Sequence, residues 1–166
     1  MSPRFSSKFP PTFTSSWLHA DDTPVPGLEP GLGKTKTGRL QTYVRDDRPA
    51  GDATPPAVWF AFSPNRKGEY PQAHLRPFVG IPQADAHAGF DPVYETGRVR
   101  EAACWAHVRR RFYDLQVAEK APVAQETRQR IAALYALEKE IRGHSPEERR
   151  QVRQARSRPL LAALRA

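Results

Sequence analysis

Residues 31–47 read GLGKTKTGRLQTYVRDD, and they decide between a nucleotide-binding loop and a β-hairpin. A Walker A loop follows the pattern G-x-x-x-x-G-K-[ST], which requires a glycine at position 28, where this chain has Leu28. Such a loop must also be followed by a helix. Residues 37–47 instead alternate between apolar and polar side chains and include β-branched residues, as in a strand. The stretch therefore predicts a glycine-rich, basic turn between two strands and no nucleotide cofactor.

Strand candidates lie on both sides of this turn. Residues 18–23 form the first, which we expect to end at Pro24 and Pro26 because proline interrupts a ladder. Residues 39–45 form the second, and residues 57–63 (AVWFAFS) the third, which is apolar enough to be a central strand. The turn-rich segment DDRPAGDATPP separates these last two strands. Two successive hairpin connections follow from this pattern.

A second group of elements follows. It comprises a crossover at 70–78, a strand at 80–84, a short helix at 91–96, a strand at 98–104 and a helix at 105–118. The connections into the last two strands are long enough to be parallel crossovers. The order is compatible with an α/β fold built on an RNase H-like mixed sheet.

The rest of the chain has helical periodicity. Ile131, Leu134, Leu137 and Ile141 share one helix face, and Gly143 ends that helix. Residues 145–148 (SPEE) then provide an N-cap, a proline at the first helical position and two acids in the first turn. The following helix is expected to kink at proline 159.

Composition narrows the functional class. The 166 residues carry a formal net charge of +8, which favours a polyanionic partner such as nucleic acid. The single cysteine excludes a disulfide framework and suits a reducing cytoplasm. No apolar run is long enough to span a membrane, and residues 1–17 lack the apolar core of a signal peptide and are expected to form a disordered leader. We therefore expect a cytoplasmic protein.

Three aspartates could carry chemistry. Asp21 and Asp22 lie on the first predicted strand, and Asp85 ends the fourth. In an RNase H-like sheet these two strands are neighbours, so their carboxylates can converge as two-cation phosphoryl transfer requires. Adjacent residues of a strand point to opposite faces, so only one of Asp21 and Asp22 is expected to bind a cation directly. On spacing alone, the competing interpretation is that these aspartates cap turns.

Taken together, the residues resemble a known family. HADDTPV, PGLGKTKTGRLQTYVRDDRP, AVWFAFSPNRKGEYPQAHL, GIPQADAHAGFDPVYE, VREAACWAHVRRRFYDL and IRGHSPEERRQVRQARSRPLLAALRA follow in one order between Leu18 and Ala166. This order resembles the insertion-sequence sixty-six family of bacterial transposases. The resemblance implies a DDE-class, RNase H-like catalytic domain that uses two magnesium ions to nick transposon ends and to join the 3′-hydroxyl to target DNA.

The resemblance also implies roles for individual residues. By position, Asp21 and Asp85 resemble the first and second catalytic, metal-binding aspartates, and Asp22 stands beside the ligand where the family commonly has Glu. The stretch GLGKTKTGR corresponds to the turn between the first two strands. Its basic side chains are expected to face DNA, because Lys and Arg bind phosphate without a preformed loop. They are Lys34, Lys36 and Arg39.

Cys104 and His107, in the sequence CWAH, allow a metal interpretation. A structural zinc site takes four ligands, and the chain offers no second ligand pair at a recognisable spacing. The resemblance instead implies a C-x-x-H signature that supports the active site. Trp105 is then expected to pack in the protein interior, with stacking on a base as the less favoured alternative. Three arginines follow on the same helix, where a solvated basic face and a DNA contact are both open interpretations. They are Arg109, Arg110 and Arg111.

The terminal helices resemble the helical insertion that the family places before its catalytic Glu. They carry a broad basic face that is expected to lie on DNA. This face consists of Arg149, Arg150, Arg153, Arg156 and Arg158. The available glutamates sit on helices that match the insertion, so none is promoted to the third carboxylate. They are Glu126, Glu138, Glu140, Glu147 and Glu148.

The expected organisation is a leader at 1–17, a partial RNase H-like core at 18–120 and a truncated helical insertion at 121–166. The expected function is that of a transposase fragment, inactive alone because the catalytic Glu is missing. Its partners would be DNA and either an intact transposase or a second copy. One alternative is a non-catalytic DNA-binding or interaction module. A P-loop nucleotide hydrolase is the alternative that position 28 argues against.

Overall fold

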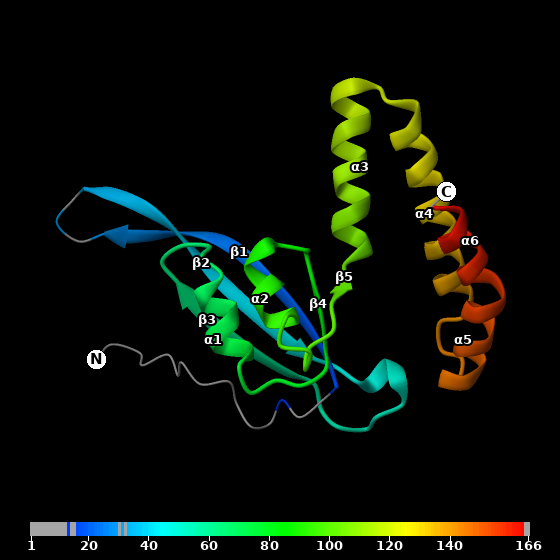
Figure 1. The fold of residues 1–166 in the computed structure, drawn as a ribbon, viewed down its shortest axis with the longest axis horizontal. Coiled ribbons are helices and arrows are strands. Elements are labelled where there is room, and N and C mark those ends of the chain that lie inside the picture. Colours follow the sequence, from blue (N-terminus) through cyan, green and yellow to red (C-terminus); the bar gives the residue numbers. More distant parts are fainter. Residues whose placement is uncertain (1–12, 14–15, 30, 32, 165–166) are drawn as a thin grey trace. The chain divides into compact units, whose positions relative to one another are not determined.

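The computed structural model describes residues 13, 16–29, 31 and 33–164. The described chain forms two compact units (Figure 1). The sheet unit comprises Met1–Asp47 with Thr54–Cys104, and the helical unit comprises Arg48–Ala53 with Trp105–Ala166. The division therefore falls just before Trp105. Most of the predicted leader, residues 1–12, 14 and 15, lies outside the described residues, but Phe13 is buried in the core of the sheet unit.

The sheet unit contains a five-stranded mixed sheet with the order β3-β2-β1-β4-β5. The strands are β1 (Trp17–Glu29), β2 (Lys34–Arg45), β3 (Ala57–Ser63), β4 (Ile81–Ala84) and β5 (Ala102–Ala103). The first three pair antiparallel, whereas β4 pairs parallel with both β1 and β5. The predicted α/β class and the neighbouring positions of the first and fourth strands are confirmed, and the arrangement is consistent with an RNase H-like core.

The first strand is longer than predicted. β1 begins at Trp17, which the sequence assigned to the leader, and it runs through Pro24 and Pro26 to Glu29. Beyond His19 no described strand pairs with the β4 side of β1, because the β1–β4 ladder covers only Trp17 to His19. Prolines are tolerated on such a free edge, since their missing N–H groups need no partner there. The prediction that these prolines end the strand is therefore wrong.

The opening turn lies where it was predicted, but it is shorter, because β2 begins at Lys34 and not at Arg39. Gly31 and Gly33 have φ values of 92° and 59°, which a residue with a side chain rarely adopts. The chain then enters β2 at Lys34 and continues in antiparallel pairing with β1. A strand, not a helix, follows the glycines, which excludes the Walker A geometry at this loop.

The third strand has the predicted bounds but not the predicted place. β3 is an edge strand, and Val58, Phe60 and Phe62 on its outer face are 51%, 48% and 47% exposed. Trp59, Ala61 and Ser63 on the other face are buried. A strand with apolar side chains on both faces is typical of the centre of a sheet. The composition of the strand does not show, however, whether a second strand pairs with its other edge.

One face of the sheet carries the core. It is covered by α1 (Glu69–Leu75), the 3-10 turn Ala88–Phe90 and α2 (Asp91–Tyr94), which are green in Figure 1. Leu18, Tyr43 and Leu75 are each 1% exposed in this core. The predicted strand at 98–104 is shorter, because only Ala102 and Ala103 pair with β4, preceded by an isolated bridge between Gly80 and Val99.

The helical unit contains the predicted helices. They are α3 (Trp105–Glu119), α4 (Pro122–Glu140), α5 (Pro146–Val152) and α6 (Arg158–Ala163). Ile131 and Ile141, on the predicted apolar face, are 0% and 1% exposed. At the start of α5 the Ser145 side chain accepts a hydrogen bond from Glu148 N, and the Glu148 side chain accepts one from Ser145 N, which completes a capping box.

The kink predicted at Pro159 takes the form of a π-helical segment, Arg153–Ser157, between α5 and α6. A proline inside a helix removes one N–H donor and its ring crowds the carbonyl four residues earlier. A single widened turn accommodates both effects. None of the described helices is both long and apolar enough to cross a bilayer.

Candidate functional site

Two carboxylates from neighbouring strands approach each other in the sheet unit. Asp22 lies within β1 and shares its strand face with the buried residues Leu18 and Ala20. Asp85 follows the last residue of β4. The chain turns immediately afterwards, at Ala86 with a φ of 57°, so the Asp85 side chain is released from the strand alternation. We call Asp22 and Asp85 the carboxylate pair.

Arg66 joins the carboxylate pair. It lies between β3 and α1, and its Nη2 atom is 2.7 Å from Asp22 Oδ1 and 2.5 Å from Asp85 Oδ2. Its Nε atom also donates hydrogen bonds to Asp22 Oδ1 at 2.9 Å and to Asp22 Oδ2 at 3.1 Å. One guanidinium therefore holds two carboxylates that come from separate strands.

The electrostatics favour this arrangement. Hydrogen bonding to Asp22 is the main reason that the pKa of Arg66 is raised, with a smaller contribution from Asp85. A second cation, Arg39, places its Nη1 atom 3.1 Å from Asp22 Oδ2. The carboxylates are only 11% and 16% exposed, so these charge pairs are screened less by solvent than pairs on an open surface.

Asp21 occupies a different position from Asp22. The parallel register of β1 and β4 pairs Leu18 with Pro82, and its continuation sets Asp21 level with Asp85. The exposed Asp21 nevertheless belongs to the strand face opposite that of Asp22. Both aspartates border a narrow cavity together with Arg66 and His87. In the structure it is therefore Asp22 that contacts the Arg66 guanidinium together with Asp85.

A network of buried polar side chains connects the sheet to the segment that carries Arg66. Tyr43 OH donates a 3.0 Å hydrogen bond to Gln41 Oε1, and His74 Nδ1 lies within 3.1 Å of both of these oxygens. Gln41 Nε2 in turn donates to Ser63 Oγ, which donates to the carbonyl of Asn65, next to Arg66. This network ties the sheet to the segment that carries the guanidinium.

His87 adds a contact at the other end. Its backbone N–H donates to Asp85 Oδ1 at 3.2 Å, and its Nε2 lies 3.1 Å from the carbonyl oxygen of Arg66. The sequence did not point to Arg66 or His87, because both lie in loops outside any periodic pattern. It did not reveal the polar network either, because strand alternation places Gln41 and Tyr43 in the core without showing which groups they contact. The one signal was Arg66 itself, a charged residue shortly after an apolar strand that ends at Ser63.

The burial of His74 makes stability depend on pH. Burial lowers the pKa of His74 below that of an exposed imidazole, so below about pH 6.5 the unfolded chain binds more protons than the folded one at this position. We therefore expect the free energy of unfolding to be fully retained above this pH and to fall as the pH drops through that range. Urea titrations at pH 7.5 and pH 5.0 will measure this loss, which His74→Gln is expected to reduce. An equal loss in both proteins would contradict the assignment to His74.

The oxygen atoms of the carboxylate pair are the type of ligand that magnesium prefers. Magnesium prefers hard oxygen ligands and is commonly held by one or two carboxylates together with water and phosphate oxygens. Asp22 and Asp85 converge on a single point that the Arg66 guanidinium now fills. Within the described part of the chain, no group of three or more His, Cys, Asp or Glu side chains is arranged to hold a metal ion. The donors fit one cation; a second would need further ligands.

The predicted DNA-facing residues of the hairpin separate into two kinds. Lys34 and Lys36 are exposed at the start of β2. Arg39, in contrast, is tied to Asp22 and belongs to the carboxylate site. On α3, Arg109, Arg110 and Arg111 are all exposed.

The basic face of the terminal helices is largely paired within the helical unit. Arg150 pairs with Glu147, Arg153 with Glu138, and Arg156 with Glu140. Arg149 donates to the carbonyl of Pro49. The remaining glutamates are also engaged, Glu126 with Arg130 and Glu148 in the capping box. These contacts give each of the five glutamates a structural partner.

The CWAH motif spans the division between the units. Cys104 is a free, half-buried thiol at the end of the sheet unit, and its backbone N–H donates to the carbonyl of Ala84. His107 is half-buried on α3 in the helical unit. Neither belongs to a candidate metal cluster of the described residues, so the zinc interpretation gains no support.

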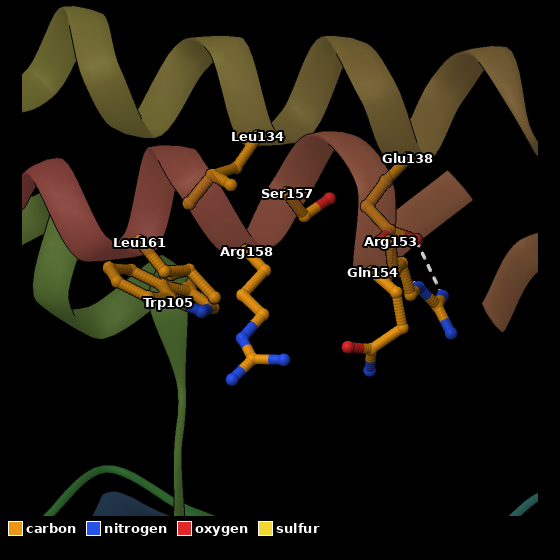
Figure 2. Close-up of a pocket in the computed structure, with 8 residues that line it drawn as sticks. All are labelled: Trp105, Leu134, Glu138, Arg153, Gln154, Ser157, Arg158 and Leu161. Carbon is orange, nitrogen blue, oxygen red and sulfur yellow. Dashed lines mark hydrogen bonds and ion pairs between the residues drawn. The ribbon is translucent and has the colours of Figure 1, made fainter. Parts of the chain in front are cut away.

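The helical unit contains a separate pocket of about 520 Å³. Figure 2 shows its lining from α3, α4, the π-helical segment and α6. The wall combines Trp105 and Leu161 with Arg158 and Gln154, and the Glu138–Arg153 ion pair lies at one end. The pocket is thus part apolar and part basic.

Comparisons with known proteins identify the family. The relatives include two uncharacterized proteins of Sinorhizobium fredii (strain NBRC 101917 / NGR234). Protein y4hP is 39% identical over 164 residues, which cover 89% of this chain and 29% of that protein. Protein y4qI is 37% identical over 154 residues, with coverages of 89% and 29%. The chain therefore spans about 29% of the length of these relatives. No solved structure matches it. The sequence model of the transposase IS66 family matches residues 12–166, and the chain belongs to that family.

Proposed function

We propose that this chain is part of the catalytic core of a DDE transposase, which cuts DNA at insertion-sequence ends and joins the strands to a target. The observation that carries the proposal is the convergence of Asp22 and Asp85 from β1 and β4 in a chain of a transposase family. DNA is the partner, together with a second transposase chain, either intact or identical to this one. The net charge of +8 suits a polyanion.

Asp85 and one of the two adjacent aspartates are proposed to hold magnesium. The ion would neutralise the charge that develops on phosphate and hydroxyl oxygens during strand cleavage and joining. The resemblance favours Asp21 as the partner of Asp85, whereas the side-chain geometry favours Asp22. The chain's own contribution is to bring carboxylates from two strands to one point and to balance their charge with Arg66 until a cation binds.

The isolated chain is expected not to cut DNA. Two converging carboxylates supply fewer ligands than a two-cation site needs, and the glutamates of the helical unit are engaged in structural contacts. Supercoiled plasmid incubated with the chain and magnesium should remain as intact as it does with Asp85→Asn. Nicking by the wild-type chain that disappears in Asp85→Asn would contradict this expectation.

Cation binding tests the site independently of cleavage. Manganese binding, followed by electron paramagnetic resonance, is expected to weaken on the order of tenfold or more when a ligand carboxylate is removed. Asp22→Asn and Asp85→Asn should both show this loss, with Asp21→Asn as the matched control. A loss in Asp21→Asn and not in Asp22→Asn would transfer the role to Asp21. No manganese binding by the wild-type chain would refute the proposed site.

A non-catalytic DNA-binding module is the second candidate. It is favoured by exposed basic side chains outside the carboxylate site, on the hairpin and on α3. They are Lys34, Lys36, Arg109, Arg110 and Arg111. Binding carried by such residues falls steeply with salt and survives removal of the aspartates, because phosphate contacts release counterions and need no metal.

A further inference from the structure

The pocket of the helical unit is unexplained by the carboxylate site. We propose that it binds an unpaired nucleotide of a DNA strand, with the base against the Trp105 indole and a phosphate at Arg158. This inference rests on DNA being the partner, as proposed above. The volume of about 520 Å³ lies within the range of ordinary ligand pockets.

Trp105 provides the stacking surface. It is the first residue of α3 and remains 39% exposed, although tryptophan is the side chain with the largest apolar area to bury. Figure 2 shows the indole beside Leu161 at one end of the pocket, and Leu134 also lines it. A base has an apolar π-face, and its stacking on an exposed aromatic ring requires no particular sequence.

Two arginines line the pocket, but only one is available to an anion. Arg153 makes a two-pronged contact with Glu138, at 2.7 Å and 2.6 Å, so its charge is balanced within the protein. Arg158 is exposed, and no acidic partner for it is present among the described residues. In Figure 2 its guanidinium extends away from the helix on the side of the Trp105 ring. The pocket lining therefore includes both an unbalanced cation and an aromatic ring.

Gln154 completes the polar side of the pocket. Its exposed amide carries both donors and an acceptor, which is the chemistry that base edges recognise. An aromatic face, an unbalanced arginine and an amide form a site for a base with its phosphate. An acidic peptide could pair with Arg158, but its carboxylates would not stack on the exposed indole of Trp105.

The geometry favours an unpaired nucleotide. In a duplex each base is stacked between its neighbours, so its faces are covered and only its edges can be contacted from the grooves. An indole in a hollow can reach a base face only at a strand end, in a single strand or at a base turned out of the stack. The pocket should therefore prefer single-stranded over double-stranded DNA.

Affinity measurements with dye-labelled DNA test this inference. Trp105→Leu is expected to weaken binding of a single-stranded oligonucleotide by about 5- to 100-fold, since stacking of one base is lost. Binding of the matching duplex should change by less than about twofold. Tyr135→Leu is the matched control, because Tyr135 is an exposed aromatic on α4 outside the pocket lining, and it should leave both affinities unchanged. Arg158→Gln should weaken the single strand and lower its dependence on salt.

A second readout guards against a folding defect in Trp105→Leu. In a Trp17→Phe protein the remaining tryptophans are Trp105 and the buried Trp59, so quenching of the exposed fluorescence by single-stranded DNA would report stacking directly. Quenching in this protein supports the inference even if Trp105→Leu folds poorly. Single-strand binding without quenching, or binding equal in wild type and a folded Trp105→Leu, overturns it. Absence of any DNA binding by the wild-type chain refutes the DNA partner itself, and with it this inference. Preferential binding of an acidic peptide that depends on Trp105 would overturn the nucleotide in favour of a protein ligand.

Discussion

Tyr43→Ala is expected to lower the free energy of unfolding of the sheet unit by about 3–5 kcal/mol, the cost of deleting a large buried aromatic side chain. Tyr43 is 1% exposed, and its ring stacks on Trp59 at a centroid distance of 5.2 Å. His74 meets both rings edge-on. Truncation to alanine would remove this stacking and leave a cavity beneath the carboxylate pair.

Tyr43→Phe separates the ring from the hydroxyl group. This variant keeps the ring contacts but leaves Gln41 Oε1 and His74 Nδ1 without the hydroxyl they contact, at a cost of about 1–3 kcal/mol. Urea unfolding followed by tryptophan fluorescence is the measurement, because Trp59 lies in the same cluster. If Tyr43→Ala cost no more than Tyr43→Phe, the ring contacts would not be stabilising the sheet unit.

The elements were predictable where one periodicity governs a segment. The short apolar run of residues 57–63 gave β3 its observed bounds, and the helical spacing of Ile131 and Leu137 gave the buried face of α4. The capping pattern at Ser145 was also sufficient to place the start of α5, because the capping box involves only neighbouring residues. Local physics thus recovered the local structure.

The edges of the sheet were not predictable in the same way. Whether proline ends a strand depends on whether the neighbouring position in the sheet is filled, which is a property of β4 and not of β1. The edge position of β3 likewise depends on a strand that is absent beside it in the described chain. These errors arise because each depends on a neighbouring segment that lies far away in the sequence.

The candidate site was predictable only in part. Spacing placed Asp21 and Asp22 on one strand and Asp85 at the end of its neighbour, and the strand order brings these positions close together. Spacing alone could not choose between Asp21 and Asp22, because the choice depends on which face of β1 is covered, and it was the family resemblance that favoured Asp21. Arg66 could not be placed at all, since a single arginine between β3 and α1 leaves no periodic signal.

Arg66→Met is expected to destabilise the sheet unit by about 2 kcal/mol, between the values for exposed and buried ion pairs. Arg66 is 38% exposed, whereas its two partners are mostly buried. Methionine preserves much of the side-chain volume but leaves two carboxylates facing each other. Arg39 still offsets part of the charge on Asp22, which keeps the loss below that of a fully buried pair.

Magnesium or manganese should reverse much of this loss. A cation that binds the folded state stabilises it in proportion to the logarithm of its concentration relative to its Kd. In the wild-type chain the cation must displace the guanidinium, so Arg66→Met should gain more in melting temperature at the same cation concentration. Arg66→Lys, which keeps the charge but loses the planar fork, should lie in between. Arg100→Met, which removes an exposed arginine of the same unit, is the control and should resemble the wild type. Equal cation responses in all four proteins would mean that Arg66 and the cation do not share a site.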